Sequence, residues 1–268
     1  MNIAFFGVNQ GRAAISSNML AVAVYTSIKN NMELSIMQTY YSNNRIEDGF
    51  MPVSSMVCMK EDFAYCRREG IDELIDDIRL NGSKCVFDNA LVNIKNTRMY
   101  YLPSTSEYSE ELFERECEKE IERLTEIIGR YKKLNFIDCG VGIGSLSESM
   151  LKECDLIVFN IEQGLHSIPK RIFENKELME KCVFLIGRYD DESRYNIRTI
   201  RRKYHIDEEC ISAIPYNIHF KDSICEGKLV DFFNRHINCG KDSEQYKFIS
   251  WVDNASNIIL RKVGMRDR

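Results

Sequence analysis

The chain has 268 residues, enough for one large α/β domain with a well-buried core or for two small domains. Hydrophobic residues make up 44% and charged residues 29%, and the formal net charge of −5 argues against nucleic acid as the main partner. The ten cysteines are scattered without a CxxC pair, so zinc-type spacing is absent. Because no signal-peptide pattern and no membrane-spanning apolar run occur, we expect a soluble, cytoplasmic protein.

Short apolar runs alternate with helical patterns along the chain. Most runs are continuous, which is typical of strands buried on both faces, and they span 3–6, 34–38, 99–103, 134–138, 155–160, 182–187 and 210–215. Helices are predicted at 17–29, 71–80, 109–132, 145–153, 167–175 and 193–205, the third with Ser109 as its N-cap. The alternation predicts an α/β fold: a single doubly wound, mostly parallel sheet of about seven or eight strands with helices on both faces.

Residues 1–240 are predicted to form this domain, and residues 241–268 to form a C-terminal amphipathic helix that packs on the domain or on a partner. The basic residues near its end would suit an anionic membrane surface; they are Arg261, Lys262, Arg266 and Arg268. Asp253 and two asparagines dilute the polar face, so contact with a membrane is the less favoured alternative.

The first loop has the order of a phosphate-binding P-loop: an apolar run, a glycine-bearing loop and then a helix that opens near Ser16 and Ser17. Two registers fit. In the first, Gly11 begins the loop, Ile15 falls at the lysine position and Ser16 supplies the metal-binding hydroxyl. In the second, Gly11 and Arg12 stand for Gly-Lys, but the hydroxyl is then lost. By itself the motif is weak, and a purely structural strand-to-helix turn explains it better.

Three separated segments resemble, in the right order, the ParA/MinD family of deviant Walker ATPases, including TadZ-like members. The segments are the first loop, NFIDCGVGIGSLSESMLKECDLIVFNIEQ at 135–163 and CISAIPYNIHFKDSICEGKLVDFF at 210–233. The resemblance covers residues 3–236 and implies a P-loop NTPase-like fold, a helix at 220–233, dimerisation, and ATP or ADP with Mg²⁺ as the cofactor. The binding residues that it implies are Gly11, Arg12, Ser16, Ser17, Asp138, Gly140, Pro215 and Asn217, with Ser16 and Asp138 at the metal.

The departures from this family fall on the positions that it uses for catalysis. Gln10 occupies the place of the signature lysine in the first register, and Gln38 stands where the family has its first acid after the second strand. A positioned cation is worth on the order of a thousandfold in phosphoryl transfer, so we assign no catalytic residue. Next to Gln38, the pair Tyr40 and Tyr41 is either a partner-binding patch or a half-buried aromatic pair.

These observations favour a ParA/MinD-like localisation or assembly factor with a degenerate nucleotide site, weak or no ATP hydrolysis, and action through protein contacts as a homodimer. Such a protein is a pseudo-ATPase rather than a competent enzyme. The alternative is an active Mg-ATP-dependent ATPase in plasmid partitioning, division-site placement or pilus positioning, in which Arg12 serves as the phosphate cation. A structural subunit with an unrelated ligand in the old site is the third alternative.

Overall fold

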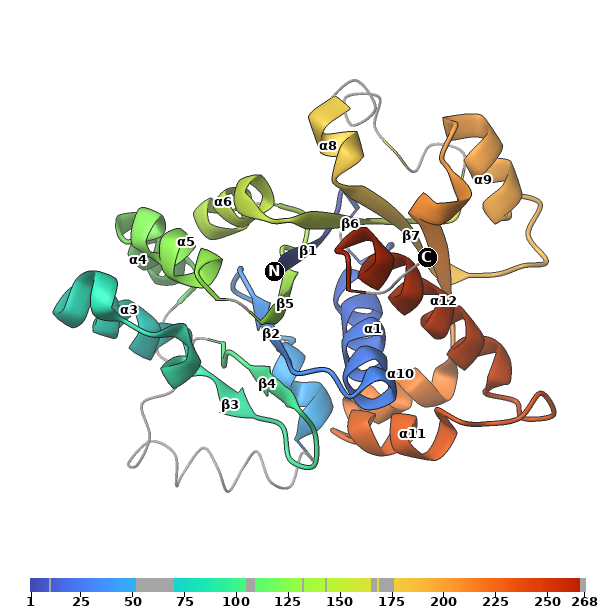
Figure 1. Cartoon of the computed structure of the whole chain (residues 1–268), viewed down its shortest axis with the longest axis horizontal. Helices are drawn as coiled ribbons and strands as arrows, with labels where there is room; N and C mark the ends of the chain where they lie inside the picture. The colour runs from blue at the N-terminus through green and yellow to red at the C-terminus, as the bar shows by residue number, and fades with distance from the viewer. Residues whose placement is uncertain are drawn as a thin grey trace.

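The fold is built on an eight-stranded sheet with the strand order β3-β4-β2-β5-β1-β6-β7-β8 (Figure 1). The structure, a computed structural model, describes residues 1–9, 11–51, 70–104, 109–131, 133–142, 144–164, 168 and 176–265. All neighbouring strands pair in parallel except β3 and β4, which are antiparallel. The predicted α/β class and mostly parallel sheet are therefore confirmed. The strands are β1 (Asn2–Gly7), β2 (Leu34–Gln38), β3 (Val92–Asn93), β4 (Met99–Tyr101), β5 (Leu134–Asp138), β6 (Leu156–Ile161), β7 (Cys182–Tyr189) and β8 (Ile211–Pro215).

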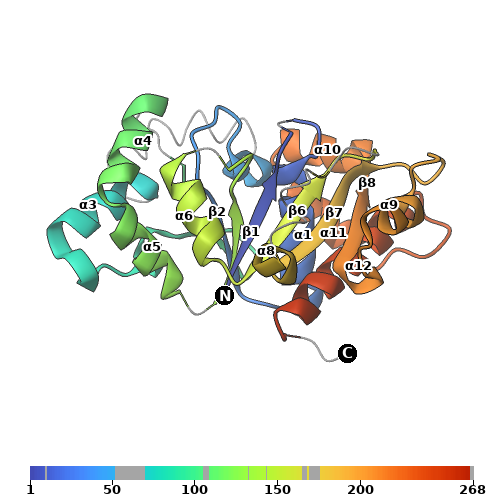
Figure 2. The same ribbon diagram turned by 90° about the horizontal axis from the view of Figure 1, so that it is seen from above.

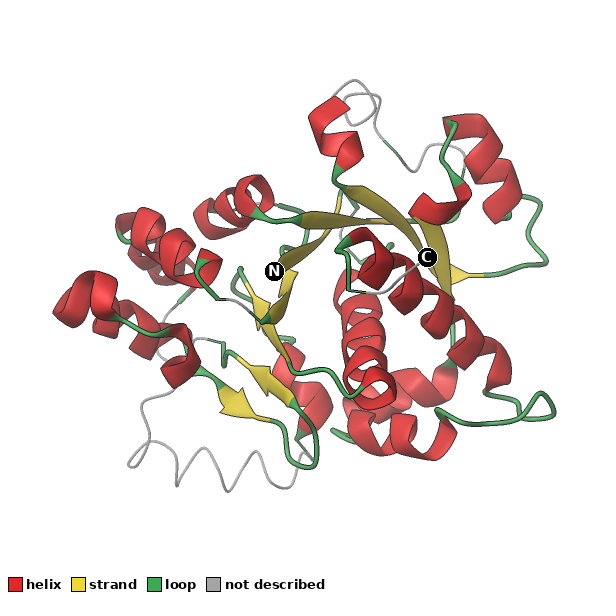
Figure 3. Ribbon diagram, viewed as in Figure 1, coloured by secondary structure: helices red, strands yellow, loops and turns green. Residues whose placement is uncertain are grey.

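Helices cover both faces of the sheet, as the red and yellow elements of Figure 3 show. One apolar core lies beneath α1 (Ile15–Asn30), α10 (Ile218–Cys225), α11 (Leu229–His236) and α12 (Tyr246–Lys262). The other lies beneath α3 (Ile71–Asn81), α4 (Glu110–Lys119), α5 (Ile121–Gly129), α6 (Ser145–Glu153) and α9 (Ile197–Tyr204), with α8 (Lys176–Glu180) at its margin. The short 3-10 helices are η1 (Ile46–Phe50), η2 (Gly82–Lys84), η3 (Phe87–Ala90) and η4 (Glu208–Cys210).

The continuous apolar runs form strands because their alternate side chains enter the two different cores. In β1, Ile3 and Phe5 belong to the core under α1, whereas Ala4 belongs to the core on the opposite face. All three side chains are fully buried. Two-sided burial of this kind removes the polar-apolar alternation that a half-exposed strand would show, which is why the strand positions could be recognised in the sequence.

Three predicted helices differ from the observed ones. Ser109 caps α4 as predicted, accepting a hydrogen bond from the amide of Leu112 at 3.4 Å, but the helix ends at Lys119 and α5 starts after Glu120. The predicted helix 220–233 breaks at Gly227, whose φ of +66° favours glycine and ends α10. The predicted helix 193–205 begins later, where Asn196 caps α9. Apart from Ile168, the predicted helix 167–175 lies outside the described residues, as does most of the loop after β2.

The C-terminal helix α12 lies against α1 and β8, as Figure 2 shows from above. Its apolar face is buried, and the hydroxyls of Thr26 and Ser256 share a buried hydrogen bond of 2.7 Å between the two helices. The division of the chain at residue 240 stays a prediction. None of the helices in the described ranges combines the length and apolar composition that a membrane crossing requires.

A buried carboxylate holds η1 to the end of β4. Glu47 is 7% exposed and accepts hydrogen bonds from the amide and the hydroxyl of Ser104, at 3.1 and 3.2 Å. Burial raises the pKa of Glu47 above its ordinary value near 4.5, because desolvation penalises the charged carboxylate more than these hydrogen bonds and Arg45 favour it. The folded protein therefore holds a proton on Glu47 at pH values where the unfolded chain has lost it.

We expect the free energy of unfolding to depend on pH through Glu47. Because the pKa of Glu47 is higher in the folded protein than in the unfolded chain, Glu47 contributes its full stabilisation below a pH of about 4.5. This stabilisation is lost as the pH rises through the folded pKa, and the loss is about 1.4 kcal/mol for each pH unit between the unfolded and the folded pKa of Glu47. Glu47→Gln cannot titrate, so its stability relative to the wild type should increase over this range. Urea unfolding of both proteins from pH 4 to 8 measures the difference. The exposed Glu209→Gln is the control, and a parallel response of both variants would contradict the prediction.

Candidate functional site

The carboxyl ends of the central strands meet at one edge of the sheet, where the loop after β1 leads into α1. The register pairs Gln38 with Asp138 between β2 and β5, and Gly7 with Asn160 between β1 and β6. In Figure 2 these strands run upward from the N-terminus, so this edge is the upper one. Ligands of open α/β sheets bind at such an edge, and the predicted site residues lie along it.

The loop between β1 and α1 is tied to the end of β5 and contains two residues with positive φ. The amide of Gly7 donates to the carbonyl of Gly140 at 3.0 Å, which ties the loop to the segment after β5. Gly11 adopts a φ of +74°, and Ala14 adopts a left-handed conformation immediately before α1. The first-turn amides of α1 thus face the loop, and helix N-termini attract anions. Gln10, predicted to replace the signature lysine, lies outside the described residues.

Two asparagines and a glycine fix this loop to the sheet beneath it. The side-chain amide of Asn18 donates to the carbonyl of Ala13 at 3.0 Å and to the Oδ1 of Asn160 at 2.8 Å, and both asparagines are 1% exposed. A Cβ on Gly187 would lie 2.1 Å from the carbonyl oxygen of Ala13, so the loop rests directly on the backbone of β7. No pattern in the sequence indicates a role for these three positions, since only their contacts across the fold make them important.

Arg12 carries the only positive charge between residues 8 and 14, and it faces a carboxylate. Its guanidinium is 3.7 Å from the Oε2 of Glu162, which follows β6, and its side chain is 73% exposed. Asn9 donates to the Oε1 of the same carboxylate at 3.1 Å. An anion that approached this loop would have to compete with Glu162 for Arg12. The segment containing Glu162 was recognised in the sequence, but nothing in that segment indicated a contact with the loop.

Asp138 is fully buried at the end of β5, and the Tyr40 hydroxyl contacts both Asp138 and Ser16. Its Oδ1 accepts a hydrogen bond from the amide of Gly140 at 2.9 Å, and its Oδ2 accepts one from the hydroxyl of Tyr40 at 3.3 Å. The Tyr40 hydroxyl is 3.4 Å from the Oγ of Ser16. The structure therefore brings three predicted site residues together, and Tyr40 joins them as an inward-facing, half-buried side chain rather than as an exposed patch.

Burial has the largest effect on the pKa of Asp138 and on the pKa of Tyr40. Desolvation raises the pKa of Asp138 above its ordinary value, although the hydrogen bonds from Ser16, Gly140 and Tyr40 oppose the shift. Desolvation, and then the neighbouring Asp138 carboxylate, raise the pKa of the Tyr40 phenol well above 10. The Tyr40 hydroxyl thus keeps its proton at neutral pH and donates a hydrogen bond to Asp138.

The residues predicted to hold Mg²⁺ do not fit the ion in this arrangement. The Ser16 hydroxyl and the Asp138 carboxylate are the hard oxygen donors that Mg²⁺ prefers, but the ion needs octahedral ligands at about 2.0–2.1 Å. The Tyr40 hydroxyl is within 3.4 Å of an oxygen on each of them. Within the described ranges, no group of three or more His, Cys, Asp or Glu side chains is arranged to hold a metal ion.

The end of β2 offers no acid at this site. Gln38 is 6% exposed, and its Oε1 has no hydrogen-bond partner among the described residues. Thr39 is bound firmly: its hydroxyl donates to the carbonyl of Asp138 at 3.1 Å and lies 2.7 Å from the hydroxyl of Ser147. Neither side chain can accept a proton from an attacking water at neutral pH.

Pro215 and Asn217 lie at the same edge but on β8 and just after it, with β6 and β7 between them and β1. The Oδ1 of Asn217 caps α10 by accepting the amide hydrogen of Phe220 at 2.8 Å, and its Nδ2 donates to Gln245 at 2.6 Å. Both polar atoms of Asn217 are therefore used within the chain. Ser17 lies half-buried in the first turn of α1, and Gly11 is exposed in the loop.

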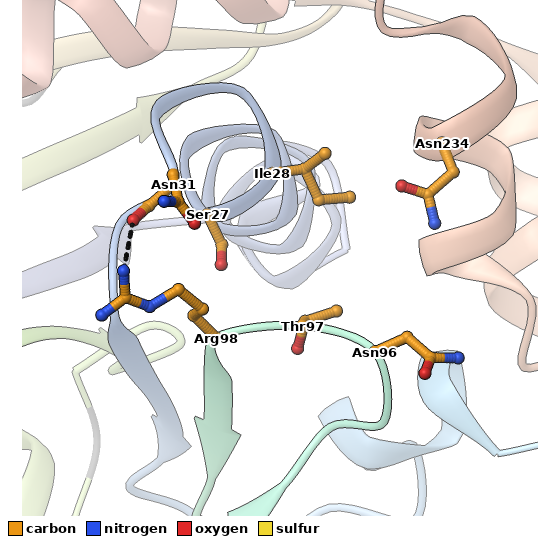
Figure 4. Close-up of a pocket in the computed structure, with 7 residues that line it drawn as sticks. All are labelled: Ser27, Ile28, Asn31, Asn96, Thr97, Arg98 and Asn234. Atoms are coloured by element: carbon orange, nitrogen blue, oxygen red, sulfur yellow. Dashed lines mark hydrogen bonds between the residues drawn. The ribbon is translucent and has the colours of Figure 1, made fainter.

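A pocket of about 350 Å³ lies at the opposite end of α1 and contains none of the predicted site residues (Figure 4). It is formed by the end of α1, the turn between β3 and β4, and α11; Ser27, Ile28, Asn31, Asn96, Thr97, Arg98 and Asn234 line it. Arg98 donates to the carbonyl of Asn31 at 3.2 Å and pairs with Glu33 at 3.6 Å. A helix rises about 1.5 Å per residue, so nearly the whole of α1 separates this pocket from the loop after β1.

The fold of this chain is similar to the folds of several solved ATPases. A ParA family ATPase from Chlorobium tepidum matches with a TM-score of 0.66 at 13% identity, over 96% of this chain and 97% of that one. MinD in the MinC:MinD cell division complex of Aquifex aeolicus matches with a TM-score of 0.64 at 12% identity, over 100% and 97%. The Pyrococcus horikoshii septum site-determining protein MinD, complexed with Mg-ADP, matches with a TM-score of 0.63 at 12% identity, over 100% and 98%.

No protein-family model matches the sequence, and no curated protein matches it. At these identities the similarity to solved structures establishes the fold alone. The chain has the fold of the ParA/MinD ATPases, as the three sequence segments implied.

Proposed function

We propose that this protein is a ParA/MinD-like localisation or assembly factor that acts through protein contacts as a homodimer. In this proposal its nucleotide site binds ATP or ADP with Mg²⁺ weakly, and hydrolysis is slow or absent. The proposal depends on one observation in the loop after β1. Arg12, the only cation of this loop, is exposed and pairs with Glu162. The similarity in fold to the ParA and MinD ATPases supports the class of protein.

In such a site we expect nucleotide affinity to be reduced less than the rate of ATP hydrolysis. Loop amides, the N-terminus of α1 and the Ser16 hydroxyl remain available to phosphate oxygens. Transfer of a phosphoryl group depends on positive charge and metal at the transferring group, and here Glu162 partly neutralises Arg12.

We expect ATP turnover by the wild type to be no faster than turnover by Asp138→Ala. The reason is that the loop after β1 has no lysine and the end of β2 has no acid among the described residues, and each such group contributes orders of magnitude to phosphoryl transfer. Release of phosphate is measured for both proteins at saturating Mg-ATP, and calorimetry with ADP measures binding in parallel. Hydrolysis that depends on Asp138 would contradict the proposal and favour the active ATPase.

The second candidate function is that active ATPase, and the exposure of Arg12 is the observation in its favour. A guanidinium that is 73% exposed at 3.7 Å from Glu162 is held by a weak surface pair, so it can turn toward a phosphate. In that case Arg12→Ala should abolish turnover, whereas the proposed factor should retain its partner contacts when Arg12 is replaced. The apolar face of α12 is buried on the domain, which argues against membrane contact through this face.

A further inference from the structure

The pocket at the far end of α1 contains polar side chains that the fold leaves uncommitted. Its two hydroxyls are used within the chain, because Ser27 and Thr97 donate to backbone carbonyls at 3.0 and 2.7 Å. Three carboxamides that line the pocket form no hydrogen bond with any described residue, and they belong to Asn31, Asn96 and Asn234. Figure 4 shows Asn234 directed from α11 toward the turn that carries Asn96. The pocket therefore presents donors and acceptors that a ligand can use.

Carboxamides match the main chain of a peptide. Each asparagine side chain offers an acceptor oxygen and two donor hydrogens, and each peptide unit offers one donor and one acceptor. The two groups can therefore form paired hydrogen bonds, and an extended segment repeats its peptide units about every 3.3 Å. Ile28, which is half-buried, adds an apolar contact at the wall. The volume of about 350 Å³ is in the range of ligand sites and suits a segment of a few residues.

Positive charge surrounds this pocket, although the whole chain has a net charge of −5. The side chain of Arg98 is 54% exposed, and neither Lys95 nor Arg235 pairs with a carboxylate in the described part of the chain. The nearby acids are Glu33, which is 3.6 Å from Arg98, and Asp231 on α11. The cations that line the pocket or adjoin its lining residues in the chain are Lys29, Lys95, Arg98 and Arg235. This local excess of cations favours an anionic ligand.

Hydrogen bonds between its elements hold the frame of the pocket in place. Lys29, in the last turn of α1, donates to the Oδ1 of Asn238 after α11 at 2.9 Å. The amide of Leu34 donates to the carbonyl of Arg98 at 3.2 Å, and the guanidinium of Arg98 donates to the carbonyl of Asn31 at 3.2 Å. A pocket that is fixed in advance loses little conformational entropy when a ligand binds.

We propose that this pocket is the docking site for an acidic, extended segment of a partner protein. The main chain of the segment pairs with the asparagine carboxamides, and its carboxylates meet Arg98 and the neighbouring cations. A peptide fits better than a nucleic acid, because a phosphate backbone has no donor for the carboxamide oxygens. This inference rests on the proposed function, since it names the place where a factor that acts through protein contacts holds its partner. It requires no nucleotide at the loop after β1.

The test measures the fluorescence anisotropy of a labelled octapeptide of alternating glutamate and glycine, titrated with the full chain. Arg98→Gln removes a charge-assisted contact, and we expect it to weaken binding about tenfold. Asn96 has a φ of +62°, so Asn96→Gly keeps the backbone conformation, removes only the carboxamide and should weaken binding about fivefold. Glu33→Gln removes the acid that competes for Arg98, and it should tighten binding about threefold.

Arg202→Gln is the matched control for net charge. Arg202 is exposed on α9, which covers the opposite face of the sheet from α1 and α11. The variant loses the same charge as Arg98→Gln without touching the pocket, and it should bind the peptide as the wild type does. Circular dichroism of each variant confirms that it is folded.

Each other outcome counts against the proposal in a distinct way. Equal weakening by Arg98→Gln and Arg202→Gln would show attraction to overall charge and overturn the pocket, as would the absence of measurable peptide binding by the wild type. An oligothymidylate that binds more tightly than the peptide and depends on Arg98 would assign the pocket to nucleic acid. These results leave the proposed function standing, because ATP turnover and ADP binding test it separately. Hydrolysis that depends on Asp138 would overturn that function without changing the binding of the peptide.

Discussion

Replacing Phe248 with alanine is expected to lower the free energy of unfolding by about 3–5 kcal/mol, the usual cost of removing a buried phenyl ring. Phe248 is 2% exposed in the first turn of α12. Its ring centroid lies 4.9 Å from that of Phe220, 5.9 Å from that of Phe232 and 6.5 Å from that of Phe233. Loss of the ring would leave a cavity between α12, α10 and α11, and would remove aromatic contacts that add to the burial.

Urea denaturation followed by circular dichroism measures this change. Ser250→Ala, at an exposed position of the same helix, is the control and should stay within about 0.5 kcal/mol of the wild type. If α12 were instead a detachable tail, Phe248→Ala would leave the unfolding midpoint of the domain unchanged. The experiment therefore also decides whether residues 241–268 act as part of the fold.

Gly187→Ala is expected to destabilise the protein by about 3 kcal/mol and to displace the loop after β1. A Cβ at this position would come within 2.1 Å of the carbonyl oxygen of Ala13 and 2.9 Å of the Nδ2 of Asn18. The first of these atoms belongs to the backbone, so no change of rotamer relieves the clash. Either β7 or the loop has to move, and a moved loop also breaks the hydrogen bonds that Asn18 makes to Ala13 and Asn160.

Two measurements check this prediction. Urea denaturation gives the loss of stability, and nuclear magnetic resonance shifts of the amides in the loop after β1 report its displacement. Gly240→Ala is the control, because an added Cβ there has no neighbour within 4 Å in the described structure. Equal stability of the two variants would show that β7 does not support the loop as described.

The proximity of Ser16 and Asp138 was implied by the resemblance to the ParA/MinD family, and the structure brings both within 3.4 Å of the Tyr40 hydroxyl. The contacts that surround them could not be predicted from the sequence. The pairing of Arg12 with Glu162 joins segments 150 residues apart in the chain. No local pattern indicates such a pair, since it depends on β6 lying next to β1. Tyr40 likewise left two interpretations open until its contacts with Ser16 and Asp138 were seen.

The sequence by itself determined the parallel α/β class, the places of the main strands and the start of α4 at Ser109. These features are local: continuous apolar runs record burial on both faces, and a serine before acidic residues caps a helix. Only the tertiary structure decided the strand order, the break at Glu120 and the short antiparallel β3. It also decided that the Tyr40 hydroxyl contacts both Ser16 and Asp138 and that Gly187 supports the loop. Those features depend on which distant side chains and backbones come into contact, and contacts of that kind are set by packing rather than by sequence spacing.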